Sequence, residues 1–293
     1  MKYLEKWGSQ QLVGEEYLDD GDILKLKVTI KHGQATFDFS GTSPVRQDNL
    51  NATEAIVCSV VCYCLRVLIN SELPLNEGLL DPIKIIVPSG TLLNPGFVSD
   101  PRQYPGVAGG NVEISQRLVD LILSSVFEVS ACSQGTMNNL TFGNQSFSHY
   151  ETICGGSGAK IGQEGTSAVQ VHMTNTAITD PEILESRFPV RLLISRIRKE
   201  SGGSGSWSGG NGVEREYLFM ENIQFSLLTQ RRVAGAQGLH GGQDGEIGKQ
   251  VVIRSTGERE ILGSFYSGLA KKGDRLLIQT PGGGGVGEQD LLA

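Results

Sequence analysis

Glycine is the residue that most limits how this chain can fold. The sequence of 293 residues contains 39 glycines and 10 prolines. Many of the glycines gather in three runs, at residues 155–158, 202–212 and 282–287. Because glycine has no Cβ, these runs predict tight turns and close approaches of one backbone to another. Trp207 lies inside the second run and strand-like segments flank it, so we expect an ordered loop there and not a flexible linker.

The first and third glycine runs differ from known phosphate-binding and catalytic loops. Residues 155–159 lack the Gly-Lys-Ser/Thr ending of a phosphate-binding loop, and Ala159 stands where a nucleophile elbow needs its last glycine. We expect a β-turn at this point. Residues 282–287 are not followed by the helix and acidic residue of a dinucleotide-binding fold. We expect them to turn beside the backbone of another domain or subunit.

Charge and hydropathy argue against several classes of partner. The formal net charge is -7 and the pI is near 5.2, whereas nucleic acids and anionic membranes require a basic face. The longest apolar run, residues 55–65, is too short to cross a bilayer. The first seven residues are mixed and polar, unlike a signal peptide. We therefore expect a cytoplasmic protein with no nucleic-acid or membrane partner.

The first half of the chain predicts a hairpin and two helices. Residues 23–30 alternate apolar and polar side chains, residues 31–34 form a turn, and residues 35–39 return, as in a β-hairpin. Asn51 is a candidate N-cap for an apolar helix that ends near Ile69. A short β-branched strand follows at residues 83–87. Apolar side chains at helical spacing predict a second helix from Asn111 to about Val129.

The second half alternates short strand-like runs with glycine clusters. The predicted strands cover residues 140–142, 148–153, 190–197, 214–219, 223–229, 250–253 and 275–279. Together with the first half, this pattern predicts an α+β fold. A mixed α/β region with two apolar helices is expected at residues 1–133, and a β-rich region with glycine-rich loops at residues 134–293.

The second predicted helix begins with polar residues of the types that active sites use. Two glycines precede it, and they would leave the first N–H groups of the helix free for an anion or a polar substrate. Asn111, Glu113, Gln116 and Arg117 then add hydrogen-bond donors and acceptors within two turns. The alternative is an ordinary helix start, with Asn111 as the cap and Glu113 favoured by the helix dipole.

A second polar cluster lies at residues 167–180. Buried polar groups at such density need partners, so this stretch is predicted to form the edge of an active-site cleft. His172 is a candidate general base, Asn175 is a candidate to orient a carbonyl, and Asp180 is a candidate partner for the imidazole. The alternative is a structural His172 whose hydrogen bonds are satisfied within the fold.

Metal-ligand spacing is absent from the sequence. The four histidines form no His-x-His or His-Glu-x-x-His pair, and the five cysteines form no Cys-x-x-Cys pair. The cysteines at positions 58, 62 and 64 lie in the first apolar helical pattern and are expected to be core thiols. We therefore predict no metal site in this chain.

Several segments, taken in order, resemble the hydantoinase B/5-oxoprolinase family. They are residues 38–44, 88–95, 109–117, 172–176, 182–191, 229–232 and 280–285. No single segment is specific, but the ordered set is, and it covers nearly the whole chain from about Asp20. The resemblance implies that the chain is part of an enzyme.

Enzymes of this family open five-membered cyclic amides such as 5-oxoproline and hydantoins, in many cases with ATP. An actin-like A-type subunit or domain phosphorylates the substrate, and the B-type part completes ring opening. Charge that develops in such a reaction needs preorganised donors. The candidate catalytic residues that the resemblance supports are His172, Asn175, Asn111, Glu113 and Arg117.

The resemblance extends only to the C-terminal part of a B-type subunit. The upstream part of such subunits carries an Asp/His-rich metal site, which this chain does not resemble. We therefore expect no cofactor in this chain. ATP and magnesium would bind the A-type partner, and a divalent metal would bind the upstream half. Activity is expected only together with those partners, and a hydrophobic face left bare by the missing half predicts an oligomer.

Two other functions fit the same resemblance. Acetone carboxylase-type enzymes use the same pair of modules to carboxylate ketones, so the chain is alternatively a component of such an enzyme. A non-catalytic truncated remnant or assembly module, which keeps the fold and binds partner subunits, is the third interpretation.

Overall fold

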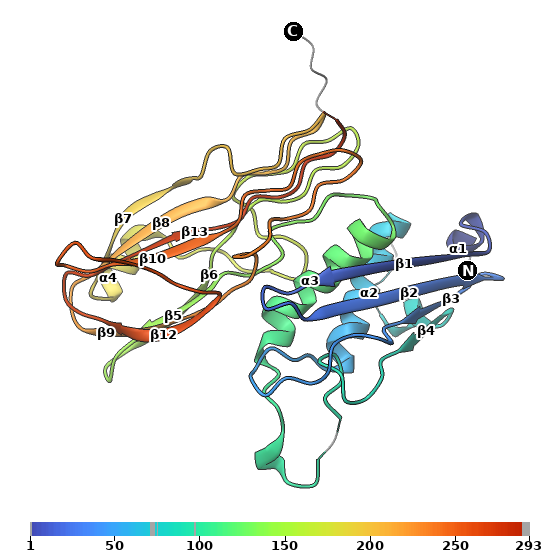
Figure 1. Cartoon of the computed structure of the whole chain (residues 1–293), viewed down its shortest axis with the longest axis horizontal. Coiled ribbons are helices and arrows are strands. Elements are labelled where there is room, and N and C mark those ends of the chain that lie inside the picture. The colour runs from blue at the N-terminus through green and yellow to red at the C-terminus, as the bar shows by residue number, and fades with distance from the viewer. Residues whose placement is uncertain (1, 71–73, 75, 97, 289–293) are drawn as a thin grey trace. The chain divides into compact units, whose positions relative to one another are not determined.

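The computed structural model describes residues 2–70, 74, 76–96 and 98–288. Helices occur there together with several sheets (Figure 1), so the predicted α+β class is confirmed. The chain divides into two compact units, Met1–Glu128 and Val129–Ala293, here called unit 1 and unit 2. The sequence prediction places the division between residues 133 and 134.

Unit 1 contains a four-stranded sheet in the order β1-β2-β3-β4. Its strands are β1 (Gln10–Tyr17), β2 (Ile23–Lys31), β3 (Gln34–Asp38) and β4 (Ile83–Ile86). Neighbouring strands are antiparallel, except that β3 and β4 run parallel. The predicted hairpin is confirmed as β2 and β3, which are joined by His32 and Gly33. Both of these residues have positive φ, as a two-residue hairpin turn requires.

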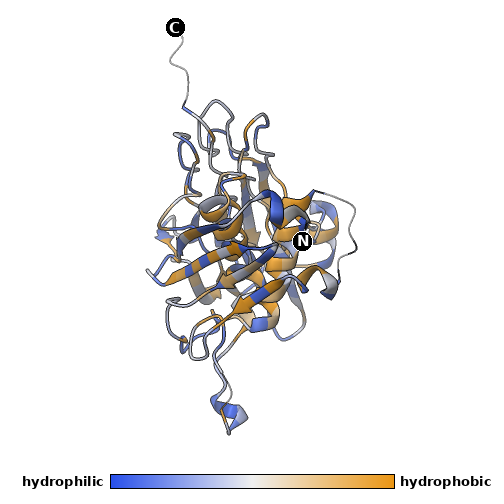
Figure 2. Cartoon of the chain, turned by 90° about the vertical axis from the view of Figure 1, so that its right-hand side faces the viewer, coloured by the Kyte–Doolittle hydropathy of each residue, from blue (hydrophilic) through white to orange (hydrophobic). Residues whose placement is uncertain are grey.

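The strands of unit 1 differ in how clearly their sequences show them. Every second residue of β2 is buried, and hydrophilic and hydrophobic residues alternate along the strands in Figure 2. The pattern in β1 is reversed, because its inner face carries Gly14 and Glu16 while Val13 is 69% exposed. No amphipathic pattern therefore marks β1 in the sequence, although this strand pairs with β2 along its whole length.

The first predicted helix exists, but its start differs from the prediction. Helix α2 spans Glu54–Ile69, and its N-cap residue is Thr53. The prediction that Asn51 caps it is wrong. Asn51 is fully buried, and its side chain bonds instead to the backbone of Arg46, Asp48 and Gly106. An asparagine bonded to two separate segments organises a loop, because both its donors and its acceptor are already used.

The second predicted helix is continuous from Gly110 to Val126. It consists of two π-helical turns, η3 (Gly110–Ile114) and η4 (Leu121–Val126), on either side of α3 (Ser115–Asp120). This helix packs on β1 and β2. Gly14 permits the contact, because a Cβ at that position would lie 2.8 Å from Cγ2 of Val126. Short helices complete the unit: α1 (Lys2–Lys6), η1 (Glu77–Leu80) and η2 (Pro101–Gln103).

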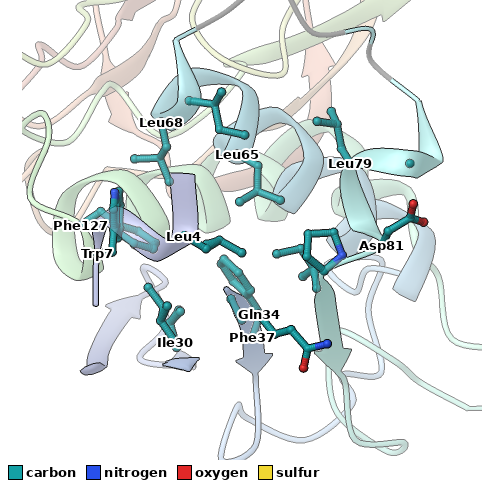
Figure 3. A pocket seen from close by; sticks show the side chains of 16 residues that line it. Leu4, Trp7, Ile30, Gln34, Phe37, Leu65, Leu68, Leu79, Asp81 and Phe127 are labelled. Atoms are coloured by element: carbon teal, nitrogen blue, oxygen red, sulfur yellow. The ribbon is translucent and has the colours of Figure 1, made fainter. Parts of the chain in front are cut away.

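Unit 1 also encloses an apolar cavity of about 400 Å³ (Figure 3). Trp7 and Phe127 stand edge to face on one side of it, with ring centroids 4.3 Å apart. Gln34 and Asp81 contribute polar atoms to its lining. Among its described lining residues there is none of the five candidate catalytic residues. The lining therefore suits an apolar group and not amide chemistry.

Unit 2 contains two antiparallel sheets that share one core. Their strand orders are β11-β10-β13-β8-β7 and β12-β9-β5-β6. The strands are β5 (Asn139–Gly143), β6 (Ser148–Thr152), β7 (Val190–Ile197), β8 (Val213–Phe219), β9 (Ile223–Leu228), β10 (Lys249–Ile253), β11 (Arg259–Ile261), β12 (Phe265–Ala270) and β13 (Arg275–Gln279). All seven predicted strands are present, and β11 and β12 were not predicted. Phe142, Phe219 and Phe225 lie in the shared core.

The glycine runs of unit 2 lie against one another, backbone to backbone. The N–H of Gly283 donates to the carbonyl of Gly210 at 2.9 Å, and the N–H of Gly210 donates to the carbonyl of Ser157 at 2.9 Å. A Cβ at Gly283 would overlap the Ser157 carbonyl, and a Cβ at Gly156 would overlap the Gly210 carbonyl. Glycine is therefore required here for contact between segments.

Two expectations about these runs change as a result. The described residues 155–159 contain no β-turn, and Gly155 instead forms an antiparallel bridge with Val169. The last run approaches backbone of its own unit. The middle run is ordered, as expected, and Trp207 forms a bridge with Val286.

Candidate functional site

The five candidate catalytic residues belong to different units. Asn111, Glu113 and Arg117 lie in unit 1, whereas His172 and Asn175 lie in unit 2. The catalytic roles of all five stay predictions.

The two glycines at the helix start in unit 1 form hydrogen bonds with nearby backbone. The N–H of Gly109 donates to the carbonyl of Asn49 at 2.7 Å, and the N–H of Gly110 donates to the carbonyl of Val107 at 3.0 Å. The N–H groups of the two glycines themselves are therefore used within the unit. Asn111 follows them and is exposed. The glycines let this turn approach the backbone of residues 49–52 closely.

The charged residues one turn later are buried inside unit 1. Glu113 has no exposed surface, and Arg117 is 1% exposed. Nη2 of Arg117 lies 2.7 Å from Oε1 of Glu16 and also donates to the carbonyl of Tyr17. These contacts join α3 to β1. In this unit Arg117 therefore contacts protein groups, and its surroundings explain why β1 carries an acid on its inner face.

In unit 2, His172 lies in a tight turn. The N–H of Thr174 donates to the carbonyl of Val171 at 3.0 Å, which closes the turn around His172. His172 is half-buried and has φ of 51°, in the left-handed region that favours glycine. Non-glycine residues in that region cost about 1–2 kcal/mol and often mark functional positions. Asn175, just beyond the turn, is exposed.

The segment that carries this turn is attached to the end of β6 by side chains. Oγ1 of Thr152 lies 2.5 Å from Oγ1 of Thr176. Nε2 of Gln170 donates to the same Thr152 hydroxyl at 3.0 Å and to the Thr152 carbonyl at 3.3 Å. Residues 170 and 176 are thus held at one point. Sequence reasoning missed Thr152, because nothing in a strand pattern marks a hydroxyl that will meet a loop 24 residues later.

Asp180 has a local structural role. It is the N-cap of α4 (Pro181–Arg187), and its Oδ1 accepts from the N–H groups of Glu182 at 2.9 Å and Ile183 at 3.3 Å. A cap of this kind stabilises a helix start by about 1 kcal/mol. This contact differs from the imidazole contact that the sequence suggested for Asp180.

A buried polar network starts at Glu151, the residue before Thr152. Sequence reasoning missed this network as well. The hydroxyl of Tyr217 donates to Oε1 of Glu151 at 2.5 Å, and Nη2 of Arg215 lies 3.8 Å from the same oxygen. Burial raises the pKa of Tyr217 well above its ordinary value, and the Glu151 carboxylate adds to this rise. The signal that could have revealed it is Glu214-Arg215-Glu216, a charged run within a predicted strand.

The Glu151 carboxyl itself is held in its ionised form. Burial acts to raise its pKa, but contacts with His149, Arg215 and Tyr217 outweigh burial and lower the pKa below its ordinary value. A carboxylate of this kind cannot donate a proton near neutral pH. It is better suited to fixing the strands than to acid catalysis.

Three further properties of the described residues limit what the chain can do. The described ranges hold no group of three or more His, Cys, Asp or Glu side chains arranged for a metal ion. In the same part of the chain, no helix is both long enough and apolar enough to span a lipid bilayer. Burial raises the pKa of the Cys154 thiol, which disfavours the thiolate that a cysteine nucleophile requires.

Comparison with known proteins connects the chain to a family of enzymes. The family model described as Hydantoinase B/oxoprolinase matches residues 1–289. The chain is 48% identical over 275 residues to 5-oxoprolinase 1 of Arabidopsis thaliana, and the match covers 93% of this chain and 21% of that protein. The chain thus spans about a fifth of the length of the curated relatives that it matches in Arabidopsis thaliana and Dictyostelium discoideum.

Two solved structures share the fold. The ATP-dependent caprolactamase from Pseudomonas jessenii superposes with a TM-score of 0.80 at 19% identity, over 98% of this chain and 54% of that chain. An acetone carboxylase superposes with a TM-score of 0.78 at 20% identity, over 96% of this chain and 45% of that chain. At these identities the likeness concerns the fold alone. The match over residues 1–289, together with the 48% identity, shows that this chain belongs to the hydantoinase B/oxoprolinase family.

Proposed function

We propose that this chain is the C-terminal part of a B-type component of an ATP-dependent cyclic amide hydrolase that opens 5-oxoproline or hydantoin rings. The observation that carries the proposal is the turn at His172, where a half-buried histidine has a left-handed backbone and the exposed Asn175 follows three residues later. The 48% identity to 5-oxoprolinase 1 supports the same reaction class.

The proposed chemistry follows from the low reactivity of an unstrained amide. An A-type partner would transfer phosphate from ATP to the amide oxygen, which makes that oxygen a leaving group. Water then attacks the ring carbon, the C–N bond breaks, and the ring nitrogen takes up a proton. A second water hydrolyses the resulting acyl phosphate, which leaves the carboxylate and inorganic phosphate. His172 would accept the proton of the attacking water, and the Asn175 amide would donate to the developing oxyanion.

The proposal includes other polypeptide. An upstream half of the B-type component and an A-type ATP-binding component would complete the site, and this chain would contribute one wall of it. Glu113 and Arg117 enter the proposal as buried residues that shape unit 1, and the exposed Asn111 stays a candidate for contact with the substrate. The buried contact of Arg117 with Glu16 supports such a structural part for Arg117.

The test is reconstitution. The chain is combined with an upstream half and an A-type component from a relative, and 5-oxoproline-dependent ADP release is measured. His172→Ala is expected to lower kcat by about 100-fold or more, as expected for loss of a general base. The matched control is His240→Ala. His240 lies in the same unit, is exposed and has a similar φ of 53°, so its removal should leave kcat unchanged.

The assay also separates the competing functions. Equal activity of the two histidine variants would remove His172 from the mechanism. No turnover of any cyclic amide with any partner pair would favour the non-catalytic assembly module. The carboxylase alternative is kept because the acetone carboxylase structure superposes almost as well as the caprolactamase, and turnover that depends on bicarbonate and a ketone would favour it.

A further inference from the structure

We propose that Thr152 is a positioning residue that sets the conformation of the loop 170–176, and through it the directions of His172 and Asn175. This proposal rests on the proposed function of those two residues. Thr152 lies at the end of β6 and is 3% exposed, so it is shielded from solvent and from substrate. Its influence on the reaction would therefore be indirect.

The direction of the hydrogen bonds between Gln170 and Thr152 is determined by the groups themselves. A backbone carbonyl only accepts, so the Thr152 carbonyl requires the Nε2 end of the Gln170 amide to face it. The same Nε2 then donates to Oγ1 of Thr152. The Thr152 oxygen keeps a second lone pair, so either hydroxyl can donate the bond that joins Oγ1 of Thr152 to Oγ1 of Thr176. One hydroxyl thus joins the start and the end of the loop.

Thr152 is itself fixed by the sheet. It pairs with Asn139 of β5 across the antiparallel ladder. The Asn139 side chain donates to the Leu228 carbonyl at 2.7 Å and accepts from the Tyr150 hydroxyl at 2.6 Å. The partner strands therefore hold Thr152 on a rigid element. In contrast, Asn175 and Thr176 are exposed.

Loss of the Thr152 hydroxyl would loosen the far end of the loop, because Thr176 would keep only its longer hydrogen bond, 3.5 Å, from Nε2 of Gln170. The backbone bridge between Gly155 and Val169 still anchors the near end, and the Gln170 contact with the Thr152 carbonyl also survives. The turn at Val171–Thr174 then loses the restraint on its C-terminal side. Because catalytic groups must be held close to their productive geometry, kcat should fall more than substrate binding.

The variants are chosen to separate the hydroxyl from the shape of the side chain. Thr152→Val keeps the volume and the β-branched form that a buried strand position favours, but it removes the hydroxyl. Thr152→Ser restores the hydroxyl. The matched control is Thr141→Val. Thr141 lies on the same face of the adjacent strand β5, and among the described contacts it makes no hydrogen bond to the loop.

Two readouts are measured. Hydrogen exchange of the Thr174 N–H in the isolated chain should be about tenfold faster in Thr152→Val, with the rest of unit 2 unchanged. In the reconstituted complex, kcat of Thr152→Val should fall about tenfold while KM stays within about twofold. Thr152→Ser and Thr141→Val should behave as wild type in both.

The outcomes decide the proposal separately from the proposed function. A rise in exchange across the whole of unit 2 would indicate general destabilisation and overturn the positioning role. So would unchanged exchange at Thr174, or a kcat equal to that of Thr141→Val. If reconstituted wild type has no turnover, the proposed function fails, and a local rise in exchange still supports Thr152 as the residue that holds the loop.

Discussion

Nη2 of Arg117 lies 2.7 Å from Oε1 of Glu16, and at most 5% of either side chain is exposed. Arg117 comes from α3 and Glu16 from β1, so the pair ties the helix to the edge strand of unit 1. The carbonyl of Tyr17 accepts a further bond from the same nitrogen. A buried charge that loses its partner is stabilised neither by water nor by an opposite charge.

Replacing one partner of this pair should destabilise unit 1 strongly. Glu16→Gln is expected to lower the free energy of unfolding by about 3 kcal/mol in urea denaturation. The control is Glu15→Gln, because Glu15 pairs with Lys25 at 2.7 Å but both are about 40% exposed, so the loss should stay below about 1 kcal/mol. The double variant Glu16→Leu with Arg117→Met should be more stable than Glu16→Leu alone or Arg117→Met alone. Additive losses would show that the pair is not coupled.

The left-handed conformation at His172 should be detectable as stored strain. Alanine at φ of 51° pays the cost of its Cβ, whereas glycine does not. His172→Gly is therefore expected to be about 1 kcal/mol more stable than His172→Ala. Thermal unfolding of both variants measures the difference. Equal stability would mean that the turn relaxes when the imidazole is removed, and that the strain depends on the histidine.

Acid should destabilise unit 2 partly through Glu151. Its folded-state pKa lies below the ordinary value of 4.5. The ionised form therefore contributes stability that is fully present above pH 4.5 and is lost as the pH falls through the lowered pKa. Urea denaturation from pH 6 to pH 3 should show the gap between wild type and Glu151→Gln shrinking below pH 4.5. A gap that stays constant from pH 6 to pH 3 would contradict this role of Glu151.

The contacts between glycine runs should tolerate no side chain. Gly283→Ala would place a Cβ on the Ser157 carbonyl, so the backbone must move and the cost should be about 3 kcal/mol or more. Gly263→Ala is the control, because the nearest atom to its added Cβ is 4.0 Å away. Its stability should change by about 0.5 kcal/mol or less. Soluble yield and thermal unfolding compare the two, and similar stabilities would show that the packed segments can separate at little cost.

Elements with a strong periodic pattern could be predicted from sequence. The alternation in β2 predicted the hairpin, and helical spacing predicted the continuous helix that starts at Gly110. Strand β1 escaped prediction because its inner face is occupied by Glu16, which is stable there only beside Arg117. Asn51 was taken for a helix cap because an asparagine before an apolar run has that meaning locally. In the folded chain the Asn51 side chain instead donates to the carbonyl of Gly106, 55 residues later.

The sequence by itself determined the α+β class, most strands, the family, and the residue types available for catalysis, because these depend on local periodicity and on ordered motifs. Only the tertiary structure decided what each polar residue contacts. Glu16 meets Arg117, and Thr152 meets Thr176, across separations that no local pattern records. The left-handed backbone of His172 was likewise decided by the turn and by its attachment to β6. A hydrogen bond or an ion pair depends on distance in space, and the folded chain alone defines that distance.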